Sequence, residues 1–511
     1  MRLSDLIATL GTCEVLGPAD AEVTGIAYDS RRVQPGDLFV PWSGGRRFGD
    51  GHRFIPEAID RGAAAVVAQR GADFDAAAVA ARVPLVVVAA SRRALAVLAA
   101  RFYGEPSLKL RLIGVTGTNG KTTTTHLIRE LLESDGRSTG LIGTIHYLIG
   151  QRRVPADRTT PQAPDIQALL AEMAADGCQA AVMEVASIAL VQERVTGCEF
   201  DVAVFTNLTQ DHLDDHGSME AYAAAKRRLF EMLGDGPAGG PPRKTGPKYA
   251  VVNIDDPESA RIQAACRVPV VTYAIDRPAA WTAGDIRVDG AGTAFRLRWP
   301  GGECPVRMPL MGRFNVYNAM AALAVASGEG VPLERAIERL GRVQPVAGRF
   351  ERVDAGQPFP VIVDYAHTPD GLANVLETAR EFTRGRLIVV FGCGGDRDPG
   401  KRPRMGEVAA RAADYVILTS DNPRSEDPEA ILAAIEEGIA GSEYARRPRE
   451  RIVDRRAAIA RAIELAQDDD VVIIAGKGHE TYQIFRDRTI PFDDRVVAAE
   501  AIRARLDGRR S

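Results

Sequence analysis

Several features are scarce in this chain, and each scarcity excludes a class of protein. Six cysteines occur in 511 residues and none forms a Cys-x-x-Cys pair, which argues against a disulfide framework or a zinc site and fits a reducing cytoplasm. No apolar run reaches the roughly 18 residues of a membrane span, and the first residues lack the layout of a signal peptide. The net charge of -4 favours neither nucleic acid nor an anionic membrane as partner. We therefore expect a cytoplasmic globular protein.

Strand and helix patterns divide the chain into three blocks, at 1–107, 108–344 and 345–511. Short apolar runs alternate with helical stretches throughout, which predicts an α/β fold class. We expect an N-terminal α/β domain, a central P-loop ATPase-like domain with a parallel sheet, and a Rossmann-like, doubly wound C-terminal domain. Within the second block, the Gly/Pro-rich segment 234–248 is expected to be a flexible surface insertion.

The strongest chemical signal is a glycine loop between an apolar strand at 110–115 and a helix that starts at Thr122. Glycines let backbone N–H groups turn toward phosphate oxygens, and the helix N-terminus adds partial positive charge. Lys121 would reach the β- and γ-phosphates and the Thr122 hydroxyl would reach Mg²⁺. Val115 stands where a strict Gly-x-x-x-x-Gly-Lys pattern begins, and an ordinary strand-to-helix turn is the alternative. The predicted ATP-binding residues here are Gly117, Thr118, Asn119, Gly120, Lys121, Thr122 and Thr123.

Groups suited to a divalent cation follow two other apolar strands. Glu184 ends one of them and could hold Mg²⁺ opposite the phosphate loop. The segment 211–216 follows the other and contains two histidines, among them His212, with three acids. The alternatives are a surface glutamate at a strand end for Glu184 and a solvated polar loop for 211–216. From the sequence alone, Lys226 is interpreted as one more surface lysine on a helix.

Three polar loops follow strands of the third block, where the ligands of such sheets bind. Two arginines suit a carboxylate, which guanidinium binds through two hydrogen bonds, and a glutamate suits an ammonium. Together the loops predict a site for a zwitterionic amino acid, although Asn-Pro and Gly-x-Gly are also common turn sequences. The candidate residues are Arg397, Asp421, Asn422, Pro423, Arg424, Gly476 and Glu480.

Taken in order, these motifs resemble the Mur ligases of peptidoglycan synthesis over nearly the whole chain. The similar positions are 116–122, Glu184, 211–212, 312–319 and 364–369. The segment 29–31 with 35–39 is similar to the tripeptide-forming branch of the family. The sequence Asp-Asn-Pro-Arg at 421–424 has the form associated with addition of meso-diaminopimelate, and lysine-adding enzymes differ there.

The resemblance implies roles for further residues. Ser30 would contact the UDP end of a UDP-N-acetylmuramoyl dipeptide, which makes the N-terminal domain its uridine-nucleotide-binding part. The muramoyl-peptide part would be held by Thr159, Thr160, Ser187, Gln192 and Arg194. For ATP, Asn315 and Asn318 would lie near adenine, Asp364 near the ribose and Arg349 near the phosphates. Lys226 takes the position of a lysine that CO₂ converts to a carbamate, which then binds Mg²⁺.

The implied reaction is amide formation driven by ATP with Mg²⁺. A carboxylate of the UDP-N-acetylmuramoyl dipeptide is phosphorylated, and the amine of meso-diaminopimelate attacks the acyl phosphate. Lys121, Glu184, His212 and Lys226 would be the catalytic residues, with Thr122, Glu184, His212 and carbamylated Lys226 around the metal. A monomer is expected, with the third block closing over ATP. Such an enzyme would serve cell-wall formation, and with it cell shape and division.

One departure and three alternatives accompany this interpretation. Ala186 and Ile188 stand where the family usually has serine and histidine, which removes a polar group near the predicted metal. The alternatives are a lysine-adding ligase, a folylpolyglutamate-type ligase, and a P-loop nucleotide-binding protein without ligase activity.

Overall fold

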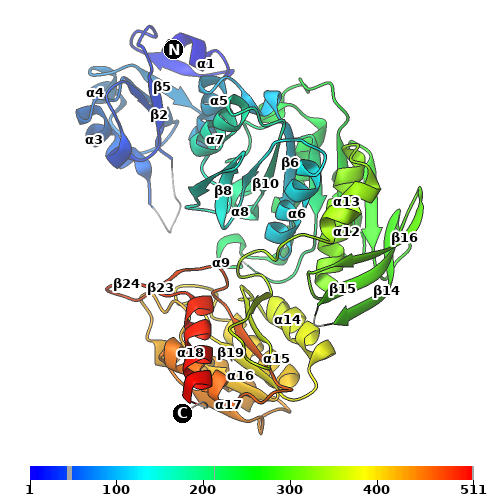
Figure 1. Cartoon of the computed structure of the whole chain (residues 1–511). Coiled ribbons are helices and arrows are strands. Elements are labelled where there is room, and N and C mark those ends of the chain that lie inside the picture. The colour runs from blue at the N-terminus through cyan, green and yellow to red at the C-terminus, as the bar shows by residue number, and fades with distance from the viewer. Residues whose placement is uncertain (43–48, 212, 290, 509–511) are drawn as a thin grey trace.

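The computed structural model describes residues 1–42, 49–211, 213–289 and 291–508. Three α/β sections follow one another along the chain, and Figure 1 shows them in blue, in cyan to green, and in yellow to red. Each section has a sheet of its own with helices packed on it. The α/β class predicted for the three blocks is confirmed.

The N-terminal section is built on a small, mostly parallel sheet. Its strands are β1 (Glu14–Leu16), β2 (Gly25–Ala27), β3 (Asp37–Phe39), β4 (Ala65–Gln69) and β5 (Leu85–Val88). Its helices are α1 (Leu3–Ile7), α3 (Ile55–Asp60), α4 (Ala76–Ala80) and α5 (Ser91–Phe102). Three 3₁₀ turns are η1 (Ser30–Arg32), η2 (Gly51–Phe54) and η3 (Pro106–Lys109). The strand order is β1-β5-β4-β3-β2, and β1 is the antiparallel member. Apolar clusters fill both faces of the sheet.

The central section has a long sheet whose middle is parallel and whose two ends are antiparallel. The strands are β6 (Arg111–Thr116), β7 (Thr139–Ile142), β8 (His146–Ile149), β9 (Arg152–Pro155), β10 (Ala180–Glu184), β11 (Val202–Phe205), β12 (Tyr249–Asn253), β13 (Val270–Ala274), β14 (Trp281–Asp289), β15 (Gly292–Trp299) and β16 (Gly302–Met308). Their order is β16-β15-β14-β13-β12-β11-β6-β10-β7-β8-β9. Strands β6, β10 and β11 are buried along nearly their whole length, as expected where helices cover both faces of a parallel sheet.

The helices of the central section include two that carry the nucleotide motifs. They are α6 (Lys121–Glu133), α7 (Ala163–Ala175), α8 (Ser187–Val191), α9 (Leu213–His216), α10 (Met219–Glu231), α11 (Ser259–Ala265), α12 (Arg313–Gly328) and α13 (Leu333–Leu340), with 3₁₀ turns η4 (Met232–Gly234) and η5 (Pro237–Gly239). Small residues let α12 pack closely on α6, and most of α12 is buried. This packing brings the 312–319 motif to the start of α6.

The C-terminal section is the doubly wound sheet that the strand pattern predicts. Its strands are β17 (Glu351–Val353), β18 (Val361–Asp364), β19 (Leu387–Phe391), β20 (Tyr415–Leu418), β21 (Arg449–Arg451) and β22 (Val471–Ala475). A separate hairpin consists of β23 (Tyr482–Ile484) and β24 (Thr489–Pro491). The helices are α14 (Pro369–Phe382), α15 (Lys401–Ala412), α16 (Pro428–Ala440), α17 (Arg455–Leu465) and α18 (Asp494–Gly508). The order is β17-β18-β22-β19-β20-β21. Strands β18, β22, β19, β20 and β21 are parallel, so their carboxyl ends meet at one edge.

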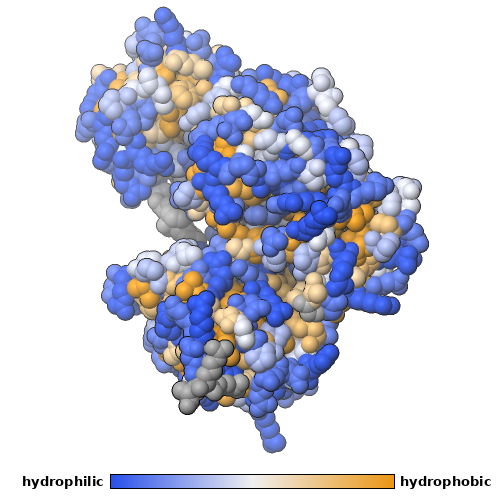
Figure 2. Space-filling model, in the orientation of Figure 1, coloured by the Kyte–Doolittle hydropathy of each residue, from blue (hydrophilic) through white to orange (hydrophobic). Residues whose placement is uncertain are grey.

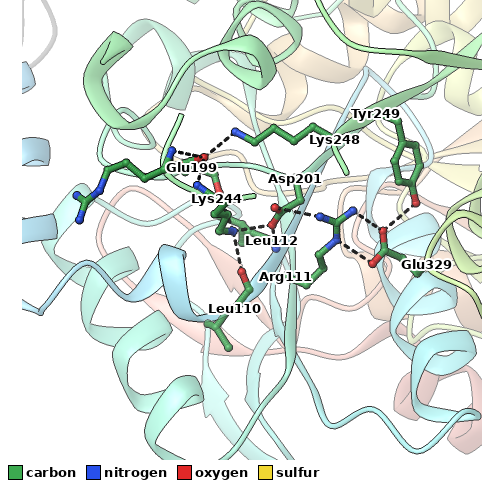
Figure 3. A network of polar contacts seen from close by, with 10 residues as sticks. Leu110, Arg111, Leu112, Glu199, Asp201, Lys244, Lys248, Tyr249 and Glu329 are labelled. Atoms are coloured by element: carbon green, nitrogen blue, oxygen red, sulfur yellow. Dashed lines mark hydrogen bonds and ion pairs between the residues drawn. The ribbon is translucent and has the colours of Figure 1, made fainter. Parts of the chain in front are cut away.

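A buried polar network anchors the segment 243–248 at the amino-terminal ends of β6, β11 and β12 (Figure 3). Glu199 is fully buried and accepts hydrogen bonds from the backbone N–H groups of residues 243 and 244 and from Lys248 Nζ (2.7 Å). Lys244 Nζ donates to Asp201 (2.5 Å), which also meets Arg111. The lysine side chains are each 9% exposed. This part of 234–248 lies at the surface, as expected, with residues 243 and 245–247 exposed, but it is anchored by buried partners at Lys244 and Lys248.

The surface is mainly polar. Hydrophilic residues predominate on the face shown in Figure 2, with hydrophobic residues in small areas between them. Within the described parts of the chain, no helix is both long enough and apolar enough to cross a membrane.

Candidate active site

The phosphate-loop motif forms a tight turn between β6 and α6. Gly117 (φ +153°) and Gly120 (φ +84°) have backbone conformations that favour glycine. A Cβ on Gly117 would overlap Thr206 Oγ1, and one on Gly120 would overlap Asn318 Oδ1. The loop is held from the side by Asn207, which accepts from the N–H groups of residues 118 and 119. The first N–H groups of α6 have no partner within the helix and face the predicted phosphate position.

Two lysines converge on one backbone oxygen of this loop. Lys121 Nζ donates to the carbonyls of Gly117 (2.9 Å) and Thr118 (2.8 Å), and Lys226 Nζ, from α10, donates to Gly117 O (2.7 Å). Burial lowers the pKa of both amines, and the neighbouring Lys121 charge lowers the pKa of Lys226 further. Lys226 is 2% exposed, so its interpretation as a surface lysine is wrong.

The carboxylate of Glu184 lies against the start of α6. It is fully buried at the end of β10, and its Oε2 accepts from Thr122 Oγ1 (2.9 Å) and Thr144 Oγ1 (3.0 Å). Its Oε1 accepts from Thr144 N (2.8 Å). Arg349, from the C-terminal section, also donates to Thr122 Oγ1 (3.0 Å). A hydroxyl and a carboxylate beside a phosphate loop are hard oxygen ligands that fit Mg²⁺.

The predicted metal ligands are not all within the described structure. His212 lies outside the described residues. Among the residues that are described, no three His, Cys, Asp or Glu side chains form a metal-binding group. The oxygens of Thr122 and Glu184 fit a Mg²⁺ ion that takes its remaining ligands from phosphate and water.

A histidine from another helix contacts the segment 186–188, in which Ala186 and Ile188 replace the serine and histidine expected from the resemblance. Ser187 Oγ lies 2.9 Å from His216 Nε2, which comes from α9. A histidine thus contacts Ser187 although Ile188 stands where the family has one. Sequence reasoning missed this contact, although the two histidines of 211–216 were noted as candidate ligands.

Most of the predicted muramoyl-peptide residues lie together around the end of β10. Thr160 Oγ1 donates to Glu184 O (2.7 Å), and Arg194 Nη1 donates to Thr160 O (2.7 Å). Arg194 also donates twice to Gln192 Oε1. Burial, and then the nearby Arg158 and Arg92, lower the pKa of Arg194 to about 10. The remaining members of the set are Thr159, which shares a hydrogen bond with Thr144, and Ser187, described above.

Ser30 lies apart from that group, in η1 of the N-terminal section. Its hydroxyl donates to Glu57 Oε2 (3.0 Å). The N-terminal and central sections meet nearby, where Tyr28 OH donates to Asp165 Oδ2 (2.6 Å). A ligand that contacts Ser30 and Arg194 together would therefore lie across these two sections.

Two of the residues predicted to bind ATP, Asn315 and Arg349, line a cavity between the central and C-terminal sections. The cavity measures about 160 Å³ and is lined by Asn315 and Arg349 together with Ala291, Pro309, Leu310, Met311, Pro345, Phe350 and Arg352. Asn318 donates to Asn315 Oδ1 (3.0 Å) and links it to α6 through Thr124. The apolar lining, which sequence reasoning did not identify, suits a flat aromatic base.

Asp364 lies at the end of β18 near this cavity. Its Oδ2 accepts from Phe350 N (2.7 Å). Burial raises its pKa to about 6, an effect that the charge of Arg349 partly offsets. Arg349 itself stacks on the ring of Tyr365, with 4.6 Å between its Cζ and the ring centroid.

The three amino-acid loops of the C-terminal section lie side by side. Asn422 Nδ2 donates to Glu480 Oε2 (2.8 Å) and Asn422 O accepts from Gly395 N (2.9 Å). Arg424 has a left-handed backbone (φ +51°) and donates to Gly395 O (2.7 Å). A side chain at Gly476 would collide with Asp421. Pro423 is buried in the same turn, and Arg397 is exposed in the loop 394–397.

The C-terminal section touches the phosphate loop directly. Asp370, in the first turn of α14, accepts from Asn119 Nδ2 (2.7 Å). His367 lies 3.9 Å from Asp211, and Arg404 pairs with Gln210. The phosphate loop and the segment that follows β11 therefore lie in direct contact with the C-terminal section.

Comparisons with known proteins agree with this geometry. Residues 22–103 match the Mur ligase family catalytic domain, 115–326 the Mur ligase middle domain, and 348–478 the Mur ligase glutamate ligase domain. The chain belongs to the Mur ligase family. As a member it is an ATP-dependent amide ligase, so the predicted ligase activity is confirmed and the non-catalytic alternative is wrong.

Similar members of the family match over the full length. The UDP-N-acetylmuramoyl-L-alanyl-D-glutamate–2,6-diaminopimelate ligase of Syntrophomonas wolfei is 48% identical over 507 residues, covering 99% of this chain and 100% of that one. The ligase of the same name from Geobacillus kaustophilus is 48% identical over 505 residues, with coverage of 99% and 100%. A solved structure of a ligase of that name has a TM-score of 0.68 at 34% identity and covers 99% of both chains. A folylpolyglutamate synthase of Mycobacterium tuberculosis (TM-score 0.61, 21% identity, coverage of 80% and 93%) shares the fold.

Proposed function

We propose that this Mur ligase joins meso-diaminopimelate to the glutamate carboxylate of UDP-N-acetylmuramoyl-L-alanyl-D-glutamate. The observation that carries the proposal is that Asn422, Arg424 and Glu480 meet on neighbouring loops. In addition, the full-length relatives of the chain are named for this activity. A guanidinium for a carboxylate and a carboxylate for an ammonium match the amino acid's far end.

The first step is phosphoryl transfer to the substrate carboxylate. The N–H groups at the start of α6 and the Lys121 ammonium bind the phosphates, and Arg349 approaches them from the other section. When bound, Mg²⁺ neutralises phosphoryl charge, and Thr122 with Glu184 would hold it. Thr160, Ser187 and Arg194 orient the carboxylate toward the γ-phosphate. The cavity at Asn315 takes the adenine, and Asp364 accepts from a ribose hydroxyl.

The second step is attack of a neutral amine on the acyl phosphate, with loss of phosphate. Glu480 and Arg424 fix the far end of the amino acid, so that its reacting amine is directed toward the phosphate loop across the junction at Asp370 and Asn119. The domains meeting there exclude water from the acyl phosphate. We assign the domain boundaries to 107/108 and 344/345.

Lys226 enters this proposal as a carbamate. Only a neutral amine adds to CO₂, and burial beside Lys121 favours the neutral form of Lys226. The carbamate oxygens would be further ligands for Mg²⁺, in addition to those of Thr122 and Glu184. ¹³C NMR after exchange with ¹³C-bicarbonate should show a carbamate signal in the wild type that Lys226→Met lacks; identical spectra would refute this assignment.

The test of the reaction is phosphate release from ATP. Release should require both the UDP-muramoyl dipeptide and meso-diaminopimelate, and L-lysine should replace the latter poorly. Release without either substrate would contradict ligation, and equal rates with lysine would contradict the amino-acid assignment. We also propose a cytoplasmic monomer, consistent with six free cysteines; light scattering and cell fractionation test it.

A further inference from the structure

A buried lysine lies at the centre of the amino-acid loops. Lys477 follows β22, and its side chain is 0% exposed. Its Nζ donates to Glu480 Oε2 (2.8 Å) and to Asn422 Oδ1 (3.2 Å). An ammonium group without solvent is costly unless it is paired and hydrogen-bonded. The lysine and its two partners therefore form one unit.

This unit fixes the side chains that face the ligand. Asn422 Oδ1 accepts from Lys477 and from Ile484 N (3.0 Å), while its Nδ2 donates to Glu480. The orientation of the amide is thus determined from both ends. Both bonds to Glu480 end on Oε2, so Oε1 is the oxygen that a ligand ammonium would meet.

The lysine also sets the charge of the pocket. Asp421 and Glu480 contribute two negative charges, and Lys477 and Arg424 contribute two positive charges. The buried Arg455 near the two carboxylates is itself paired with Asp494 (2.7 Å), so the charges cancel. Arg397 is exposed and is screened by water. A neutral pocket suits an end group that is itself a zwitterion. A lone ammonium, such as that of lysine, would be favoured instead by a pocket with one net negative charge.

We propose that Lys477 is a positioning and specificity residue, whose charge makes this pocket prefer the zwitterionic end of meso-diaminopimelate to the ammonium end of lysine. The inference rests on the proposed function of the site. Lys477 acts through Asn422 and Glu480 and does not itself contact the reacting atoms. A residue with a purely structural role would change stability without changing the preference between the two amino acids.

Two substitutions separate the charge from the hydrogen bonds. Lys477→Met removes both, whereas Lys477→Gln removes the charge and keeps an N–H donor. In each variant the ratio of kcat/KM for meso-diaminopimelate to kcat/KM for L-lysine should fall by about tenfold or more, because a unit charge a few ångströms away acts at low effective dielectric. KM for ATP should stay within about twofold of wild type. Lys244→Met, another buried and paired lysine far from these loops, should leave the ratio unchanged.

The wild-type protein gives a test that does not depend on the folding of any variant. A neutral pocket should reject L-lysine and L-2-aminopimelate, which lacks the distal amine, to a similar degree. A pocket in which the Lys477 charge has no effect would accept lysine far better than aminopimelate, and that result would overturn the inference.

The outcomes also distinguish this inference from the proposed function. If the wild type shows no release of phosphate dependent on meso-diaminopimelate, the proposed function fails. If the wild type is active but folded Lys477→Gln keeps the wild-type ratio, the charge inference fails and the proposed function stands.

Discussion

Replacement of Asp364 by asparagine should stabilise the protein near neutral pH while weakening its binding of ATP. The carboxylate lies in a buried position at the end of β18, where burial raises its pKa from 3.8 to about 6. The Arg349 charge and the backbone N–H groups of Phe350 and Ala366 offset only part of this effect. The ionised side chain is thus held in a place that favours its neutral form.

The size and the sign of the effect follow from that shift. The rise of the Asp364 pKa from 3.8 to about 6 corresponds to about 3 kcal/mol. Because the folded state holds its proton more tightly than the unfolded state, stability falls as the pH rises from about 4 to about 6. Above pH 6 the full cost is present, and below pH 4 both states are protonated and the cost disappears. Asp364→Asn should therefore gain up to about 3 kcal/mol at pH 8 and little at pH 4.

Denaturant unfolding at pH 4 and pH 8 measures this gain in stability. Titration of the reaction with ATP measures the change in KM for ATP. KM for ATP should rise by about tenfold, since a ribose hydroxyl would lose an anionic acceptor. Asp468→Asn, at an exposed aspartate of the same section, is the matched control and should change neither quantity. A stability gain of equal size at both pH values, or none at pH 8, would refute the reasoning.

Three further substitutions test other parts of the structure. Gly117→Ala should abolish phosphate release because its Cβ would overlap Thr206, whereas Gly136→Ala, also at positive φ but in open space, should stay active; equal activities would contradict the loop geometry. Arg349→Lys should raise KM for ATP by about tenfold through loss of the planar donor, as ATP titration would show; an unchanged KM would argue against its phosphate role. Glu199→Ala should lower the free energy of unfolding by about 3–5 kcal/mol, since Lys248 would be left buried and unpaired; a change below about 1 kcal/mol in urea unfolding would contradict this.

The features that the sequence predicts well are local ones. The phosphate loop is recognisable because strand, glycines, lysine and helix are contiguous, and the α/β pattern is recognisable because apolar runs are periodic. The junction of the three C-terminal loops is predictable because parallel strands bring their carboxyl ends to one edge. The resemblance to a family then supplied Asn315, Arg349 and Asp364, which local patterns do not mark.

The features that could not be predicted depend on contacts between distant segments. Lys226 looks like a surface residue within its own helix, and only the packing of α10 against the phosphate loop buries it. Local patterns do not mark Lys477 either, since its pairing with Asn422 joins residues 55 positions apart. The segment 243–248 is rich in residues typical of loops, yet it is held by hydrogen bonds to Glu199, 44 to 49 positions earlier in the sequence.

The two lysines that donate to Gly117 O influence each other's charge. Two ammonium groups that share one carbonyl oxygen repel each other, and this repulsion lowers the pKa of Lys226 in addition to the effect of burial. The carbamate proposed for Lys226 replaces a positive charge by a negative one, so that it would attract Lys121 rather than repel it. Phosphates bound at α6 favour the cationic form of Lys121 as well. Carbamate formation and nucleotide binding therefore act on the same charge, and each is expected to hold Lys121 in the protonated form that phosphoryl transfer needs.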